Sequence, residues 1–148
     1  MRTVHAYCRW SYGPVMYISP TPEAIGSLVA RNIEGPVTML NLLRFRETAN
    51  YSDAPDLAPE DSISGEEAYA IYSAHTVPHL ESVGGTVVFM GEGGSLLIGP
   101  HEARWDRVLL VQYPNLAAFV AMTQNPQYHK GAGHRTAALE DSRLLPMV

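Results

Sequence analysis

The strongest hydrophobic pattern in the chain is an unbroken run over residues 37–45. Apolar side chains occupy most of its positions on both alternating faces, which is typical of a strand that is buried on both sides. Shorter apolar runs at 86–90, 107–113 and 143–147 predict three further strands. The sequence therefore predicts a four-stranded sheet in which the 37–45 strand is central.

Helical signals separate these strands. Ser64-Gly65-Glu66-Glu67 matches a capping box, in which the serine side chain and the glutamate side chain each bind the other residue's backbone N–H, so a helix is predicted to begin there. Gly84-Gly85 is a strong stop signal for this helix. Other helices are predicted from Thr21 to near Gly35, after Asn115, and from Asn125 to about Leu139.

The order of these elements predicts an α+β fold. Without the N-terminal helix and a long polar loop at 47–64, the order is strand, helix, strand, strand, helix, strand, which is that of a ferredoxin-like βαββαβ sandwich. Residues 1–15 lack periodicity and are expected to be a loosely ordered extension, followed by a single domain at 16–148. Because two helices cover only one face of the sheet, we expect a second copy of the chain to cover the other, giving a homodimer.

Composition excludes several classes of partner. The chain has 148 residues, of which 46% are hydrophobic, and its 10 basic residues are outnumbered by 15 acidic ones, so nucleic acid is not an expected partner. No apolar run is long enough to span a membrane, and the start of the chain does not resemble a signal peptide, so a cytoplasmic location and no membrane partner are expected. Cys8 is the only cysteine, which excludes an intrachain disulfide and a multi-cysteine metal site.

Two polar side chains stand out within apolar segments. Asn41 is the only amide in the 37–45 strand, and a buried amide needs partners for both its oxygen and its nitrogen. Arg135 shares an apolar helix stripe with Tyr128, and its permanent charge requires an anion. Asn41 either ties neighbouring strands together or contacts a ligand. The anion at Arg135 is either Asp141 or the carboxylate, phenolate or enolate of a ligand.

The helix that begins at Ser64 carries Tyr69, Tyr72 and His79 on one face. His79 could exchange a proton with a ligand near neutral pH, or a tyrosine hydroxyl could satisfy it inside the core. His75 lies four residues before His79, but no third ligand follows at a recognisable spacing, so no metal site is expected. Trp105 could cover the sheet edge or the dimer seam, or stack on a substrate.

Several short motifs, taken in order, point to a known family. They are Met39-Leu40-Asn41-Leu42-Leu43-Arg44-Phe45, Tyr72, Gly84-Gly85, Trp105-Asp106-Arg107, Tyr113-Pro114, Asn125-Pro126-Gln127-Tyr128, Arg135 and Asp141-Ser142-Arg143-Leu144. Over about residues 37–147 this pattern resembles the family known as domain of unknown function 1330, within the dimeric α+β barrel superfamily. The resemblance implies a homodimer of ferredoxin-like subunits that form a dimeric α+β barrel. It implies no settled activity, because the wider superfamily includes both enzymes and simple binders.

Three functions are compatible with these residues. The chain could be an enzyme that needs no cofactor and acts on a small anionic or enolisable organic molecule. Asn41 and Arg135 would then stabilise negative charge, and His79 or Tyr72 would move a proton. Tyr69, Tyr128 and Trp105 complete the predicted ligand site. The chain could instead be a noncatalytic binder of a similar ligand, or a structural dimer. No motif for a nucleotide, a metal or a nucleophile elbow is present.

Overall fold

The computed structural model describes residues 16–148. Its elements, in chain order, are α1 (Pro22–Ala30), β1 (Val37–Phe45), the 3-10 turn η1 (Pro55–Leu57), α2 (Gly65–Ser82), β2 (Thr86–Ser95), β3 (Arg104–Tyr113), α3 (Leu116–Gln124), α4 (Pro126–His129), α5 (Ala132–Ala138) and β4 (Leu139–Met147). No helix in this part of the chain is long and apolar enough to cross a membrane.

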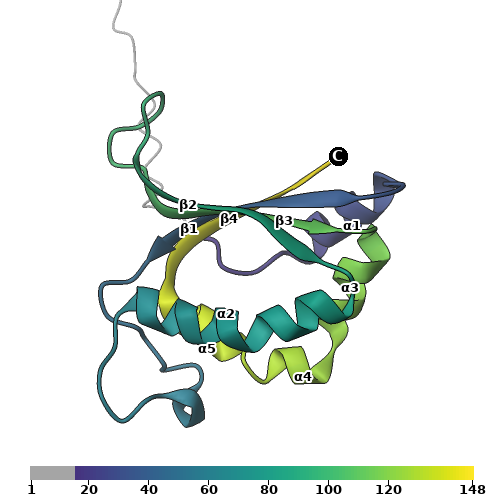
Figure 1. The fold of residues 1–148 in the computed structure, drawn as a ribbon. Helices are drawn as coiled ribbons and strands as arrows, with labels where there is room; N and C mark the ends of the chain where they lie inside the picture. Colours follow the sequence, from purple (N-terminus) through teal and green to yellow (C-terminus); the bar gives the residue numbers. More distant parts are fainter. Residues whose placement is uncertain (1–15) are drawn as a thin grey trace, which may run out of the picture.

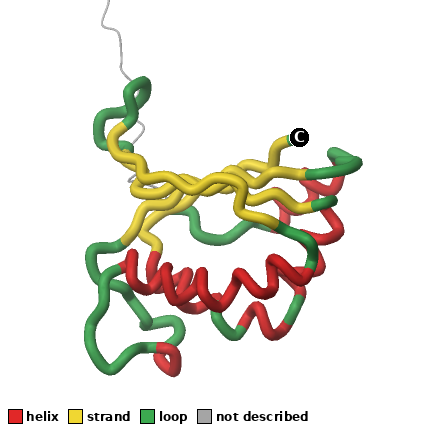
Figure 2. The backbone as a smooth tube through the Cα atoms, in the orientation of Figure 1, coloured by secondary structure: helices red, strands yellow, loops and turns green. Residues whose placement is uncertain are grey.

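The four strands form one antiparallel sheet in the order β2-β3-β1-β4. Helices α2, α3, α4 and α5 all lie on the same side of this sheet, and within residues 16–148 none of them covers the other side (Figures 1 and 2). The strand order and the single helical layer are those of a ferredoxin-like α+β sandwich, with α1 added before it. The predicted fold class is therefore confirmed, and β1 is one of the two inner strands.

The alternation of side chains along β1 explains its central position. Val37, Met39 and Leu43 are at most 1% exposed and pack against the helices, together with Phe45 at the strand end. Side chains at the intervening positions, such as Leu40, point to the uncovered side of the sheet and are only half-buried. One face of β1 is thus part of the core, and the other face is partly exposed to solvent.

Helix α2 begins as the sequence predicts. The Ser64 side chain accepts a hydrogen bond from the Glu67 N–H at 3.1 Å, and the Glu67 carboxylate accepts one from the Ser64 N–H at 2.7 Å. A Cβ atom at Gly65 would collide with the backbone carbonyls of Arg46 and Ala138, so only glycine fits this close approach. The first turn of α2 is therefore clamped between the end of β1 and the end of α5.

Several predicted boundaries differ from the structure: α1 ends at Ala30, and β3 and β4 begin at Arg104 and Leu139. Two further differences have a clear physical cause. The helix expected from Asn125 to Leu139 is broken into α4 and α5 around Gly131, whose Cα packs so closely on the His75 ring that a side chain would not fit. The second difference is in the β2–β3 hairpin, which extends beyond the predicted strand at 86–90. Glycines at 91, 93 and 94 continue the ladder rather than ending it, because they lie opposite β3 in a regular antiparallel register.

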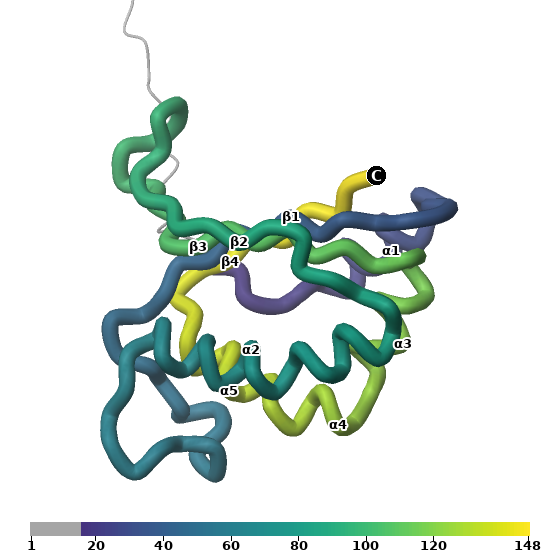
Figure 3. Tube along the Cα trace, in the orientation of Figure 1, coloured from purple at the N-terminus to yellow at the C-terminus, as the bar shows by residue number. Residues whose placement is uncertain are grey.

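Residues 16–18 pair with the edge strand β4. The Tyr17 N–H donates to the Asp141 carboxylate, and the Ser142 N–H donates to the Tyr17 carbonyl, each at 2.8 Å. This segment lies on the helix side of the sheet (Figure 3). The expectation about residues 1–15 falls outside the described residues.

The long loop at 47–64 is held against α5. The Asn50 N–H donates to the Ala137 carbonyl at 2.9 Å, and the Tyr51 hydroxyl and His134 Nδ1 are hydrogen bonded at 2.8 Å. The loop therefore packs beside the helical layer (Figure 1).

Candidate functional site

A row of aromatic rings fills much of the space between the sheet and α2. Ring centroids are separated by 5.4 Å from Phe45 to Tyr69, 5.3 Å from Tyr69 to Tyr72, and 6.3 Å from Tyr72 to Tyr128. Tyr69 and Tyr72 are three positions apart on α2 and so share its buried face, while Tyr128 comes from α4. The hydroxyls of Tyr72 and Tyr128 are hydrogen bonded at 3.0 Å. We refer to Tyr69, Tyr72 and Tyr128 as the tyrosine row.

Burial keeps these phenols in their neutral form. It raises the pKa of Tyr69, Tyr113 and Tyr128 well above the usual value for tyrosine. The positive charge of Arg135 acts in the opposite direction on the pKa of Tyr69 and Tyr128. At neutral pH these side chains are therefore hydrogen-bond donors and poor bases.

Arg135 has only uncharged partners. Its Nη1 donates to the Ile18 carbonyl at 2.5 Å, and its Nη2 lies 3.4 Å from the Ser142 hydroxyl. Among residues 16–148, no carboxylate lies within 4.0 Å of the guanidinium, and residues 1–15 contain no aspartate or glutamate. The half-buried positive charge of Arg135 is thus not neutralised by a contacting acid of this chain.

Asp141, the acid that the sequence offered to Arg135, is engaged elsewhere. Its carboxylate accepts a hydrogen bond from Arg143 at 2.6 Å and lies 3.6 Å from Arg44. Burial acts to raise the pKa of Asp141, but the hydrogen bonds from the Tyr17 N–H, from Arg143 and from the Ser142 N–H together lower it. Asp141 is therefore ionised at neutral pH and is already surrounded by donors.

Asn41 lies on the wall of the sheet that faces the tyrosines. It shares a face with the buried Met39 and Leu43, and its neighbours across the sheet are Leu109 and Leu144. Its Nδ2 donates to the Met39 carbonyl at 3.2 Å, while its side-chain oxygen accepts no hydrogen bond from another residue in 16–148. The side-chain nitrogen of Asn41 is thus bound to its own strand, and the side-chain oxygen can still accept a hydrogen bond.

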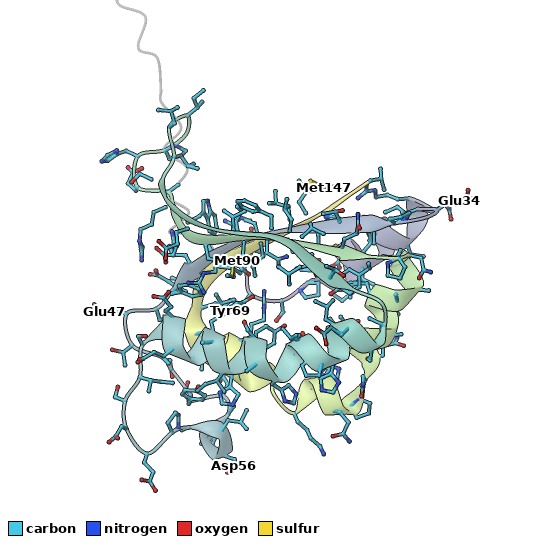
Figure 4. The ribbon with its side chains drawn as sticks, viewed as in Figure 1. Glu34, Glu47, Asp56, Tyr69, Met90 and Met147 are labelled. Carbon is cyan, nitrogen blue, oxygen red and sulfur yellow. The ribbon has the colours of Figure 1, made fainter. Side chains whose placement is uncertain are left out.

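At the β2 edge of the sheet, two side chains on the helix side are exposed. Val87 and Met90 lie opposite Val111 and Leu109 of β3, whose side chains pack toward the helices, yet they are 43% and 64% exposed. Figure 4 shows Met90 and Tyr69 between the sheet and α2. Residues 16–18 bridge β4 and α5 on the opposite side of the sheet.

The structure does not bring the other two predicted site residues to this row. The His79 ring packs on His75, with centroids 5.1 Å apart, and His75 is hydrogen bonded to the Gln127 carbonyl at 2.8 Å. Trp105 lies over the guanidinium of Arg143, at 5.2 Å from the ring centroid. Arg143 is paired with Leu42, on the face of the sheet away from the helices. The proposed roles of His79 and Trp105 stay predictions.

One residue beside the site was missed by the sequence reasoning. The Arg107 guanidinium lies over the Phe45 ring at 5.2 Å from its centroid and pairs with Glu66 at 2.6 Å. Both Arg107 and Glu66 line an open hollow of about 360 Å³ at this end of β1. The sequence signal that could have indicated it is that Arg107 is a charged residue within the predicted strand at 107–113. Within 16–148, no three His, Cys, Asp or Glu side chains are grouped to hold a metal ion.

Comparisons with known proteins agree with this architecture. The chain is similar to the RPA0582 protein, a protein of unknown function from Rhodopseudomonas palustris, in two crystal structures. The methylated form is 42% identical with a TM-score of 0.80 over 89% of this chain and 93% of that one. The other is 41% identical with a TM-score of 0.80 over 90% and 96%. No curated protein matches the chain.

The family comparison covers more than half of the chain. Residues 60–146 match the model described as Domain of unknown function (DUF1330). This range begins just before the capping box of α2 and continues almost to the end of β4, so it includes the tyrosine row and Arg135. The chain belongs to the DUF1330 family.

Proposed function

We propose that this protein binds a small organic anion, or an enolisable compound held as its enolate, in the space between the sheet and α2. The observation that carries the proposal is the half-buried guanidinium of Arg135, whose partners within residues 16–148 are the Ile18 carbonyl and the Ser142 hydroxyl, with no contacting carboxylate. A partly desolvated charge of this kind is stabilised when an anion of complementary shape arrives. Neither a metal nor a cofactor is part of the proposed site.

Each wall of the site has a distinct role in this proposal. Arg135 supplies the positive charge, and the hydroxyls of Tyr69, Tyr72 and Tyr128 donate hydrogen bonds to the anion. The Tyr69 hydroxyl has no hydrogen-bond partner within 16–148, although the residue is only 5% exposed, so it is available to a ligand. Asn41, on the sheet, contacts a polar group at the end of the ligand that is farther from Arg135.

Binding without catalysis is the form of the proposal that the geometry favours. The His79 ring packs on His75, and burial makes Tyr69 and Tyr128 poor bases. An enzyme acting on the same ligand is the alternative, with Tyr72 or His79 as the group that moves the proton. The alternative requires proton exchange at a bound carbon acid, which can be followed by the loss of deuterium from a labelled ketoacid.

We also propose that the protein is a homodimer in which a second copy covers the uncovered face of the sheet. This face carries the half-buried Leu40, Val108 and Leu110, together with Phe89 and Leu145, which are 53% and 54% exposed. A continuous apolar face of this kind is rarely left in water by a monomer. Because both copies present the same face, a two-fold axis satisfies both at once.

A titration with 4-nitrophenol tests the ligand proposal. Its anion absorbs visible light and its acid does not, so a cationic site that prefers the anion raises the absorbance at constant pH. We expect the protein to produce a saturable increase that is absent for Arg135→Met. The control is Arg31→Met, which removes an exposed arginine whose guanidinium also donates to a carbonyl, at 2.9 Å from the Pro146 oxygen. An increase that survives in Arg135→Met, or that no protein concentration produces, contradicts the proposal.

A further inference from the structure

The hairpin between β2 and β3 continues beyond the rest of the sheet as a two-stranded arm, residues 92–104. Pairing between β1 and β3 ends at Arg107, whereas pairing between β2 and β3 continues to Ser95 and Arg104. The arm rises from the sheet on the side away from the helices (Figures 1 and 2). It therefore stands on the same side as the uncovered apolar face.

The tip of the arm carries three consecutive aliphatic residues, two of them almost fully exposed, directly before Gly99 and Pro100. Leu97 is 98% exposed and Ile98 is 92% exposed, and Leu96 beside them is 39% exposed. Two adjacent branched aliphatic side chains at the hairpin tip gain almost nothing from packing against residues 16–148. Gly99 and Pro100, which follow directly, are usual turn residues, whereas adjacent exposed aliphatic residues are unusual at a hairpin tip. Contact with another molecule would remove this apolar area from water.

The bend at the base of the arm is built into the sequence. A Cβ atom at Gly93 would collide with the backbone carbonyl of Trp105 on the opposite strand. Only glycine allows the two strands to approach this closely, and the sequence places Gly91 and Gly94 on either side. The direction of the arm therefore follows from backbone packing at its base.

The arm stands beside the uncovered face and enlarges the surface that a second copy can meet. Four strands at the usual spacing, each with about seven paired residues, give a flat footprint of about 450 Å². Stable interfaces bury about 800 Å² of accessible surface on each partner, a measure that follows the relief of the side chains and so exceeds the flat footprint of the same contact. A second copy seated on the sheet gains further contact area where it also meets the arm.

We propose that the arm clasps a second copy of this chain, with Leu97 and Ile98 packed on the flank of the partner. This inference rests on the homodimer proposed above and adds the element that holds it together. In a two-fold pair each copy gives one arm and receives one, so both tips are buried by the same symmetry operation. The net charge of −5 disfavours the alternative occupant, an anionic lipid surface.

The double variant Leu97→Ser, Ile98→Ser tests the inference. Both side chains are almost fully exposed in the single chain, so the variant should keep the circular dichroism spectrum and the thermal unfolding behaviour of an isolated subunit. We expect its dimer dissociation constant, measured by sedimentation equilibrium, to rise about a hundredfold or more, because two aliphatic anchors are lost from each arm. The control is Val77→Ser on the outer surface of α2, which should leave the dissociation constant unchanged.

The outcomes separate the two proposals. A wild-type protein that sediments as a monomer contradicts the homodimer itself, and with it the clasp. A wild-type dimer whose dissociation constant is unchanged in the double variant contradicts the clasp and leaves the homodimer standing. Binding of the wild type, but not of the variant, to vesicles of phosphatidylcholine and phosphatidylserine would assign the tip to a membrane and overturn the clasp.

Discussion

Replacing Leu110 by glutamate is expected to convert the protein into a monomer that keeps its fold. Leu110 lies in the middle of the uncovered face, opposite Leu40 and beside Phe89, and it is half-buried within the single chain. In a two-fold dimer, one substitution places two carboxylates in the same apolar interface without partners. Burying an unpaired charge costs several kcal/mol, so the dissociation constant should rise by about a thousandfold or more.

Sedimentation equilibrium of the wild type and the variant measures this effect. Ile71→Glu is the matched control, because Ile71 is an aliphatic residue 39% exposed on α2, away from the uncovered face. The control should remain dimeric. A dimeric Leu110→Glu protein would show that copies associate through a different surface, and that the sheet face is covered in another way.

Replacing Arg135 by methionine is expected to abolish anion binding while changing the free energy of unfolding by only about 1 kcal/mol. The substitution keeps much of the side-chain volume. It removes the hydrogen bond to the Ile18 carbonyl, and it also removes a half-buried charge that has no contacting carboxylate. These two effects oppose each other, so the urea midpoint should move little.

Arg44→Met supplies the contrasting case. The Arg44 guanidinium forms ion pairs with Glu140 at 3.2 Å and with Asp141 at 3.6 Å. Its loss removes one of two guanidinium groups beside the buried Asp141 carboxylate, and losing an interaction with a charged group costs about 1.5–3 kcal/mol. We expect a clear drop in the urea midpoint for Arg44→Met and a small change for Arg135→Met. A drop of equal size in both would show that Arg135 balances an acid of this chain, and would remove it from the ligand site.

The parts of the fold that the sequence predicts correctly are those set by local rules. The alternation of Val37, Met39 and Leu43 against half-buried neighbours follows from strand geometry, and the start of α2 follows from the hydrogen bonds of Ser64 and Glu67. The tyrosine row is partly local too. Tyr69 and Tyr72 share a helix face because of their spacing, although the approach of Tyr128 comes from tertiary packing.

The features of the site that could not be predicted from the sequence depend on which hydrogen-bond or ion-pair partner each polar group contacts. Asp141 follows Arg135 closely in the chain, yet β4 carries it to Arg143, Arg44 and the backbone of residues 16–18. The Ile18 carbonyl, 117 residues away, then becomes the neighbour of Arg135. Helical spacing places His79 near Tyr72, but its ring turns to His75. These contacts join segments that are far apart in the sequence, so no local sequence pattern predicts them.

The central claim is that Arg135 and the tyrosine row hold an organic anion between the sheet and α2. The most direct measurement is the anomalous diffraction signal of bromine in crystals soaked with 4-bromophenolate, because it locates the ligand without reference to its shape. We predict one strong peak inside this space, next to Tyr69 and Tyr72, that is lost in crystals of Arg135→Met. Bromine that is found only on the outer surface, or that remains in this space in Arg135→Met crystals, would contradict the claim.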